Sequence, residues 1–86
     1  MVGGLQRAID RFPQLAASIR DRFDDEQSFR DMCHDYAETL EALERWQASD
    51  SPRRAARIEE YRELGGALEV EIFAALSAPP RIPKTT

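Results

Sequence analysis

The chain has 86 residues, of which 42% are hydrophobic and 33% are charged, and its formal net charge is −4. This length leaves room for a single folded domain, and the high charged fraction favours amphipathic helices over a sheet with two buried faces. The acidic balance disfavours binding to nucleic acid or to an anionic membrane, because those surfaces carry charge of the same sign.

Other composition features narrow the class of protein further. No apolar run approaches the roughly 20 residues that a membrane-spanning helix needs, and Met1 to Leu5 does not resemble the start of a secretory signal. Cys33 is the only cysteine, which excludes an intrachain disulfide. We therefore expect a cytoplasmic protein that is held together by packing and carries no cofactor.

Residues 5–23 are predicted to form one or two short helices. Their apolar positions recur three or four residues apart and are Leu5, Ile9, Phe12, Leu15, Ile19 and Phe23. Pro13 interrupts this pattern, because proline restricts the residue before it and is itself suited to begin a helix. Met1–Gly4 should fray, since two glycines next to a terminus offer little to pack.

Two long helices, at about 25–48 and 52–77, are predicted to follow. Asp24 and Gln27 form a capping-box pattern at the start of the first, and Asp50 or Ser51 can cap a second helix that begins at Pro52. A turn of about three residues makes the two helices antiparallel. The prediction is an all-α helical hairpin, with 1–78 as one helical domain and 79–86 as a proline-rich disordered tail.

Each long helix carries an apolar seam with alternating spacings of three and four residues, which is typical of two helices packed along their length. If the turn centres between Asp50 and Ser51, every seam residue meets a seam residue. The predicted pairs are Phe29 with Ile72, Cys33 with Leu68, Tyr36 with Gly65, Leu40 with Tyr61, and Leu43 with Ile58. In this register Gly65 makes room for the ring of Tyr36.

The two flanks of this seam differ in character. One carries Ala37, Ala55 and Leu76 with an opposed pair, Arg30 and Glu69. The other is more apolar and carries Met32, Thr39, Trp46 and Leu64. We predict that the second flank is a partner interface, covered by residues 5–23 folding back or by a second copy in a four-helix bundle. The two are compatible, and a homo-oligomer, most simply a dimer, is expected because so short a chain has a small core of its own.

Two groups of residues suggest other chemistry. Cys33 and His34 are the only adjacent soft metal ligands, but neighbouring helical residues point about 100° apart, so a metal site would need further ligands supplied by symmetry. A packed thiol and a solvated imidazole explain them more simply. We identify no catalytic residue and no metal site.

Three arginines crowd the start of the second long helix, where the helix dipole disfavours cations: Arg53, Arg54 and Arg57. In one interpretation Glu41 and Glu44 lie beside them and Arg57 lies over Trp46. In the other they bind an anion at the helix N-terminus.

A set of residues also resembles the pattern of the small bacterial YdcH-like proteins, an uncharacterised family of short helical hairpins. The residues that carry this resemblance are Phe12-Pro13, Phe29, Tyr36, Leu43, Arg45, Leu68, Glu71, Ile72 and Leu76. The resemblance covers most of the chain and implies a cytosolic hairpin with no known activity, cofactor or catalytic residue. The leading hypothesis is a non-enzymatic interaction module that self-associates or binds a partner helix. The alternative is a small metal- or redox-responsive helical bundle that uses Cys33 and His34.

Overall fold

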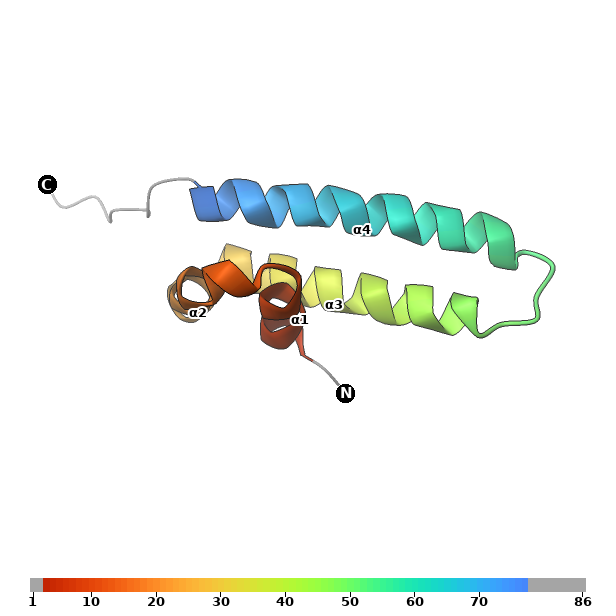
Figure 1. The fold of residues 1–86 in the computed structure, drawn as a ribbon, viewed down its shortest axis with the longest axis horizontal. Helices are drawn as coiled ribbons and strands as arrows, with labels where there is room; N and C mark the ends of the chain where they lie inside the picture. Colours follow the sequence, from red (N-terminus) through yellow and green to blue (C-terminus); the bar gives the residue numbers. More distant parts are fainter. Residues whose placement is uncertain (1–2, 78–86) are drawn as a thin grey trace, which may run out of the picture.

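A computed structural model describes residues 3–77, and the predicted tail at 79–86 lies outside this range. The described elements are α1 (Gly4–Arg11), a 3₁₀ turn (Pro13–Leu15), α2 (Ala16–Asp25), α3 (Gln27–Gln47) and α4 (Arg54–Ser77). No strand occurs among the described residues. In Figure 1, α3 and α4 lie side by side along their length and form the antiparallel hairpin, which confirms the predicted fold class.

The connection between α3 and α4 uses the predicted turn signals, although it is longer than predicted and spans residues 48–53. The Ser51 hydroxyl oxygen accepts a hydrogen bond from the backbone N–H of Arg53, 3.1 Å away. The guanidinium of Arg54 donates to the backbone carbonyl of Gln47 at 3.1 and 3.2 Å. This carbonyl lies at the end of α3 and has no partner within its own helix, so the arginine links the end of one helix to the start of the next.

The predicted capping box at the start of the first long helix is wrong. Asp24 lies within α2, which continues to Asp25. Glu26 has extended backbone angles, φ −123° and ψ 112°, and separates α2 from α3 without a side-chain cap. Its carboxylate instead pairs with Arg22, 3.3 Å away and one turn earlier. α3 therefore begins at Gln27, two residues after the predicted start near 25.

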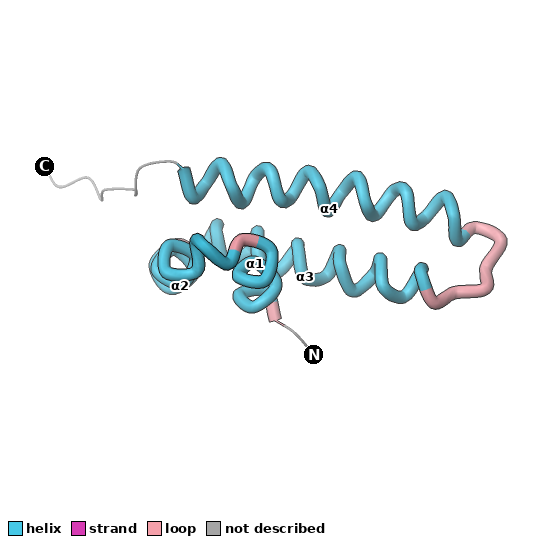
Figure 2. Tube along the Cα trace, viewed as in Figure 1, coloured by secondary structure: helices cyan, strands magenta, loops and turns pink. Residues whose placement is uncertain are grey.

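The N-terminal helices fold back onto the hairpin at the end away from the connection. Figures 1 and 2 show α1 and α2 nearly end-on, crossing α3 rather than running beside it. The buried core gathers at this end and consists of Ala8, Phe12, Ile19, Phe29, Cys33, Tyr36, Leu68 and Ile72. Towards the connection the seam residues Leu43, Ile58 and Tyr61 are only partly buried. The hairpin is therefore well covered at one end and thin at the other.

Gly4, which we expected to fray, is buried where α1 meets α3. A Cβ atom at this position would lie 2.8 Å from the backbone carbonyl of Cys33 and 2.8 Å from the backbone nitrogen of His34. Because backbone atoms inside a helix have little freedom to move, only glycine fits here. The expectation was wrong because it counted only local contacts and could not include a helix that is distant in the sequence.

Gly65 has a different environment from the predicted one. An added Cβ would meet only a methyl carbon of Thr39, at 3.9 Å, and no atom of Tyr36 lies within 4 Å of it. The hydroxyl of Tyr36 instead donates a hydrogen bond to Glu69, 2.7 Å away. The idea that Gly65 makes room for the Tyr36 ring is therefore wrong, and the other individual seam pairs stay predictions.

Candidate interaction surface

The N-terminal helices cover the flank of the hairpin that carries Ala37 and Glu69. Arg11 of α1 forms an ion pair with Glu69 of α4, 3.2 Å between Nε and Oε1. The rings of Phe12 and Phe73 lie 5.9 Å apart, centre to centre. Ala37, on the same flank, is 4% exposed. The chain thus covers the less apolar of its two flanks.

A second ion pair fixes α1 along α3. The guanidinium of Arg7 donates two hydrogen bonds of 3.0 Å to the two carboxylate oxygens of Glu44, which is the fork-like geometry that arginine and carboxylates prefer. These hydrogen bonds lower the pKa of Glu44 and raise the pKa of Arg7. Because the two residues are 37 positions apart, no local spacing in the sequence points to this contact.

The predicted opposition of Arg30 and Glu69 is replaced by other contacts. Arg30 donates to the backbone carbonyl oxygens of Phe23 and Asp24, where α2 ends. Glu69 accepts hydrogen bonds from Tyr36 and pairs with Arg11, so its carboxylate joins α1, α3 and α4. Burial, followed by the hydrogen bond with Glu69, raises the pKa of Tyr36 above its ordinary value.

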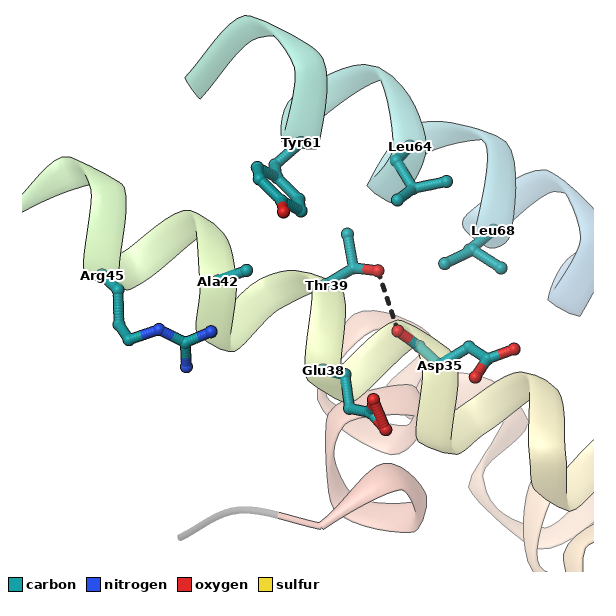
Figure 3. Close-up of a pocket in the computed structure, with 8 residues that line it drawn as sticks. All are labelled: Asp35, Glu38, Thr39, Ala42, Arg45, Tyr61, Leu64 and Leu68. Atoms are coloured by element: carbon teal, nitrogen blue, oxygen red, sulfur yellow. Dashed lines mark hydrogen bonds between the residues drawn. The ribbon is translucent and has the colours of Figure 1, made fainter. Parts of the chain in front are cut away.

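The opposite flank holds an open groove between α3 and α4 with a volume of about 440 Å³. The residues that line it are Asp35, Glu38, Thr39, Ala42, Arg45, Tyr61, Leu64 and Leu68. In Figure 3, Tyr61, Leu64 and Leu68 extend from α4 towards Thr39 and Ala42 on α3, while the N-terminal helices lie behind α3. Leu64 is 47% exposed, so much of its side chain faces solvent in the groove.

The floor of this groove can be covered without leaving the Thr39 hydroxyl unpaired. Thr39 is 7% exposed, and its hydroxyl donates to the backbone carbonyl of Asp35, 2.8 Å away. A partner that displaces water from this site therefore leaves that hydroxyl satisfied. The groove combines small or apolar side chains with the phenol ring of Tyr61 and three charged side chains.

The structure brings two of the four predicted interface residues together. Thr39 and Leu64 both line the groove. Met32 is half-buried against the core, and Trp46 is half-buried nearer the connection, outside the groove lining. Tyr61 and Leu68, which we assigned to the seam, also line the groove.

The sequence analysis missed four lining residues on α3: Asp35, Glu38, Ala42 and Arg45. A signal exists for Asp35 and Ala42 but not for Glu38 and Arg45, because positions 35, 39, 42 and 46 repeat the spacing of four, three and four residues that marks a helix-packing stripe. Among the ion pairs of residues 3–77, none includes Asp35, Glu38 or Arg45. The rim charges of the groove are therefore available to a partner.

Cys33 and His34 lie in different environments. The Cys33 side chain is fully buried, and this burial raises the pKa of its thiol to about 11. His34 is exposed, with its ring edge-on to Phe23 at 5.6 Å. No group of three or more His, Cys, Asp or Glu side chains in the described part of the chain is arranged to hold a metal ion.

The arginines near the connection contact other groups than the predicted ones. Arg57 pairs with Glu60, 3.0 Å away on the next turn of α4, rather than lying over Trp46. Glu44 pairs with Arg7 instead of approaching these arginines. Arg54 donates to the carbonyl of Gln47 at the end of α3, so Arg54 and Arg57 both have partners within the chain.

Within residues 3–77, no helix combines the length and the apolar character that crossing a membrane requires. Comparisons with models of protein families, with curated proteins and with solved structures found no match to this chain. The resemblance to the YdcH-like proteins stays a prediction.

Proposed function

We propose that this protein is a non-enzymatic interaction module that acts through the open flank of its helical hairpin, by self-association or by binding a partner helix. The observation that carries the proposal is the placement of the N-terminal helices. They cover the flank with Ala37 and leave open the groove that contains Thr39 and Leu64. A groove between two helices accepts a third helix, because side chains three and four residues apart can insert into it.

The environments of the two most reactive side chains support a non-enzymatic role. A nucleophilic or metal-binding cysteine acts as the thiolate, whereas the raised pKa of Cys33 keeps its thiol protonated near neutral pH. His34 lies on the surface beside the Phe23 ring and has no nucleophile as its partner. We also propose a cytoplasmic location and a protein partner rather than nucleic acid, in keeping with the net charge of −4.

Site-specific photocrosslinking in cells tests the proposal. A photoreactive amino acid at position 64 probes the groove, and the same amino acid at position 70 is the matched control. Val70 is 69% exposed and, six residues from Leu64, faces away from the groove, so both substitutions spare the core. We expect covalent adducts mainly from position 64, with the crosslinked peptide lying in a helical segment of the partner or of a second copy.

Two outcomes would overturn the proposal. Adducts of equal yield at both positions would mean that binding partners do not prefer the groove to the outer face of α4. Adducts mainly from position 70 would place the interaction on the outer face of α4 instead.

A further inference from the structure

The open flank carries opposite charges at its two ends. On α3, Asp35 and Glu38 lie near the middle of the helix, and Arg45 lies closer to the connection. On α4, Glu71 and Arg57 are each seven residues from Leu64 and therefore lie on the same face of the helix. Arg57 lies near the connection, and Glu71 lies towards the opposite end of α4. Arg57 also has a local, exposed pair with Glu60. The side of the flank away from the connection is therefore acidic, and the side nearer to it carries Arg45 and Arg57, with Glu60 beside Arg57.

Two symmetric arrangements can place this flank on the same flank of a second copy. If the two hairpins point in the same direction, α3 lies over the α4 of the other copy, so Arg45 approaches Arg57 and the acidic ends meet. If the hairpins point in opposite directions, α3 lies on α3 and α4 on α4, so Arg45 approaches Asp35 and Glu38 of the other copy. Like charges oppose the first arrangement, and opposite charges favour the second.

We propose that the occupant of the groove is a second copy of this chain, bound with its hairpin reversed about a two-fold axis that passes near Leu64. This inference rests on the proposed function and names its partner. The axis places Leu64 against Leu64 of the other copy and brings Arg57 close to Glu71. An interface of this kind is self-complementary, as two-fold symmetry requires.

The spacing of residues on α3 fits the same axis. The stripe formed by positions 35, 39, 42 and 46 reads the same from either end, so in the reversed pair Thr39 lies level with Ala42 of the other copy. Both side chains are small and nearly buried within the hairpin, 7% and 9% exposed, so neither obstructs the approach of the second α3. The Thr39 hydroxyl is already bonded to the Asp35 carbonyl, so this approach does not leave that hydroxyl unpaired.

Sedimentation analysis of charge variants tests the electrostatic part. The wild-type chain should sediment as a dimer, and Arg45→Glu should weaken its association at least tenfold by placing a third carboxylate against Asp35 and Glu38. Adding Glu38→Arg to Arg45→Glu should restore most of the affinity. Arg20→Glu, on the exposed side of α2, makes the same charge change elsewhere and should leave association within twofold of wild type.

Disulfide trapping tests the orientation. Leu64→Cys should form a covalent dimer readily, because the axis brings the two positions together. Arg57→Cys and Glu71→Cys should each crosslink poorly alone but form a mixed disulfide when the two variants are combined. The buried Cys33 does not compete for oxidation, and peptide mapping of the products confirms which thiols have joined.

The outcomes separate this inference from the proposed function. A wild-type monomer at millimolar concentration, or failure of Leu64→Cys to crosslink while other positions succeed, overturns the reversed dimer. If position 64 then captures a helix of a different protein in cells, the proposed function stands without self-association. If photocrosslinking shows no preference for position 64, the proposed function itself fails.

Discussion

Replacing Gly4 with alanine tests whether α1 depends on direct backbone contact with α3. The new Cβ would lie 2.8 Å from backbone atoms of Cys33 and His34, whereas ordinary contacts begin at 3.4 Å, so α1 must move by about 0.6 Å or more. Forcing extra atoms into a packed site costs about 1–3 kcal/mol. Alanine returns at most about 1 kcal/mol of helix propensity. The difference spans about 0–3 kcal/mol, and we take the middle of this range, about 1–2 kcal/mol, as the expected net loss in the free energy of unfolding.

Urea and thermal unfolding, followed by circular dichroism, measure this loss. For a domain of this size, 1–2 kcal/mol corresponds to a fall in Tm of roughly 5–15 °C. Gly66→Ala is the matched control, because an added Cβ there meets nothing within 4 Å. It should raise the stability instead, so the same chemical change has opposite signs at the two positions.

A double-mutant cycle measures whether Gly4 and the Arg7–Glu44 ion pair stabilise the same contact. Gly4→Ala and Glu44→Gln both weaken the attachment of α1 to α3, so their combined loss should be smaller than the sum of the single losses. If Gly4→Ala is as stable as the wild type, the close packing of α1 on Cys33 is refuted. Full additivity would show that the glycine and the ion pair act on separate parts of the fold.

Three further expectations concern the glycines in α4, the Arg7–Glu44 pair and the buried thiol. Gly65→Ala and Gly66→Ala should each raise the free energy of unfolding by up to about 1 kcal/mol, measured in urea, because neither Cβ meets a close contact. Since Arg7 lowers the pKa of Glu44 in the folded state, the stabilisation is present above the unfolded pKa near 4.3 and is lost as the pH falls through the folded value. Acid titrations of wild type and Glu44→Gln should therefore converge at low pH, and a constant difference would contradict this reasoning. Burial raises the pKa of Cys33 from 9.0 to about 11, so a thiol reagent should label Cys33 slowly at neutral pH until urea unfolds the chain. For the same reason, the contribution of the protonated thiol to the free energy of unfolding should be lost as the pH rises from about 9 to 11. Rapid labelling of the native protein would contradict its burial.

The hairpin could be predicted because its determinants are local. The seam spacing in both long helices and the turn signal at Ser51 and Pro52 lie within a few residues of what they specify, and the structure shows the Ser51 hydrogen bond. The end of α2 shows the limit of such signals. Asp24 was predicted as a cap, but it is a helical residue near the end of α2, where Arg22 pairs with Glu26.

The flank that the N-terminal helices cover could not be predicted in the same way. It depends on the fit of Gly4 against Cys33 and on ion pairs such as Arg7 with Glu44, which join residues far apart in the chain. The sequence analysis placed Thr39 and Leu64 on the more apolar flank, which is the flank that stays open. It did not include Arg45 because a single charged residue on a helix is indistinguishable from a solvated surface until its neighbours are known.

The uneven cover of the hairpin has a consequence for its length. α1 and α2 pack mainly on the end away from the connection, and Arg7 reaches Glu44 near the end of α3. Closer to the connection the hairpin is two helices thick and its seam residues are partly exposed. Amide hydrogens near the connection should exchange with solvent first, because few contacts oppose local opening there. Seven residues inserted into each long helix on either side of the connection would extend the hairpin by about 10 Å and preserve the seam spacing. The length of the hairpin can therefore change without altering the packing of α1 and α2 at its covered end.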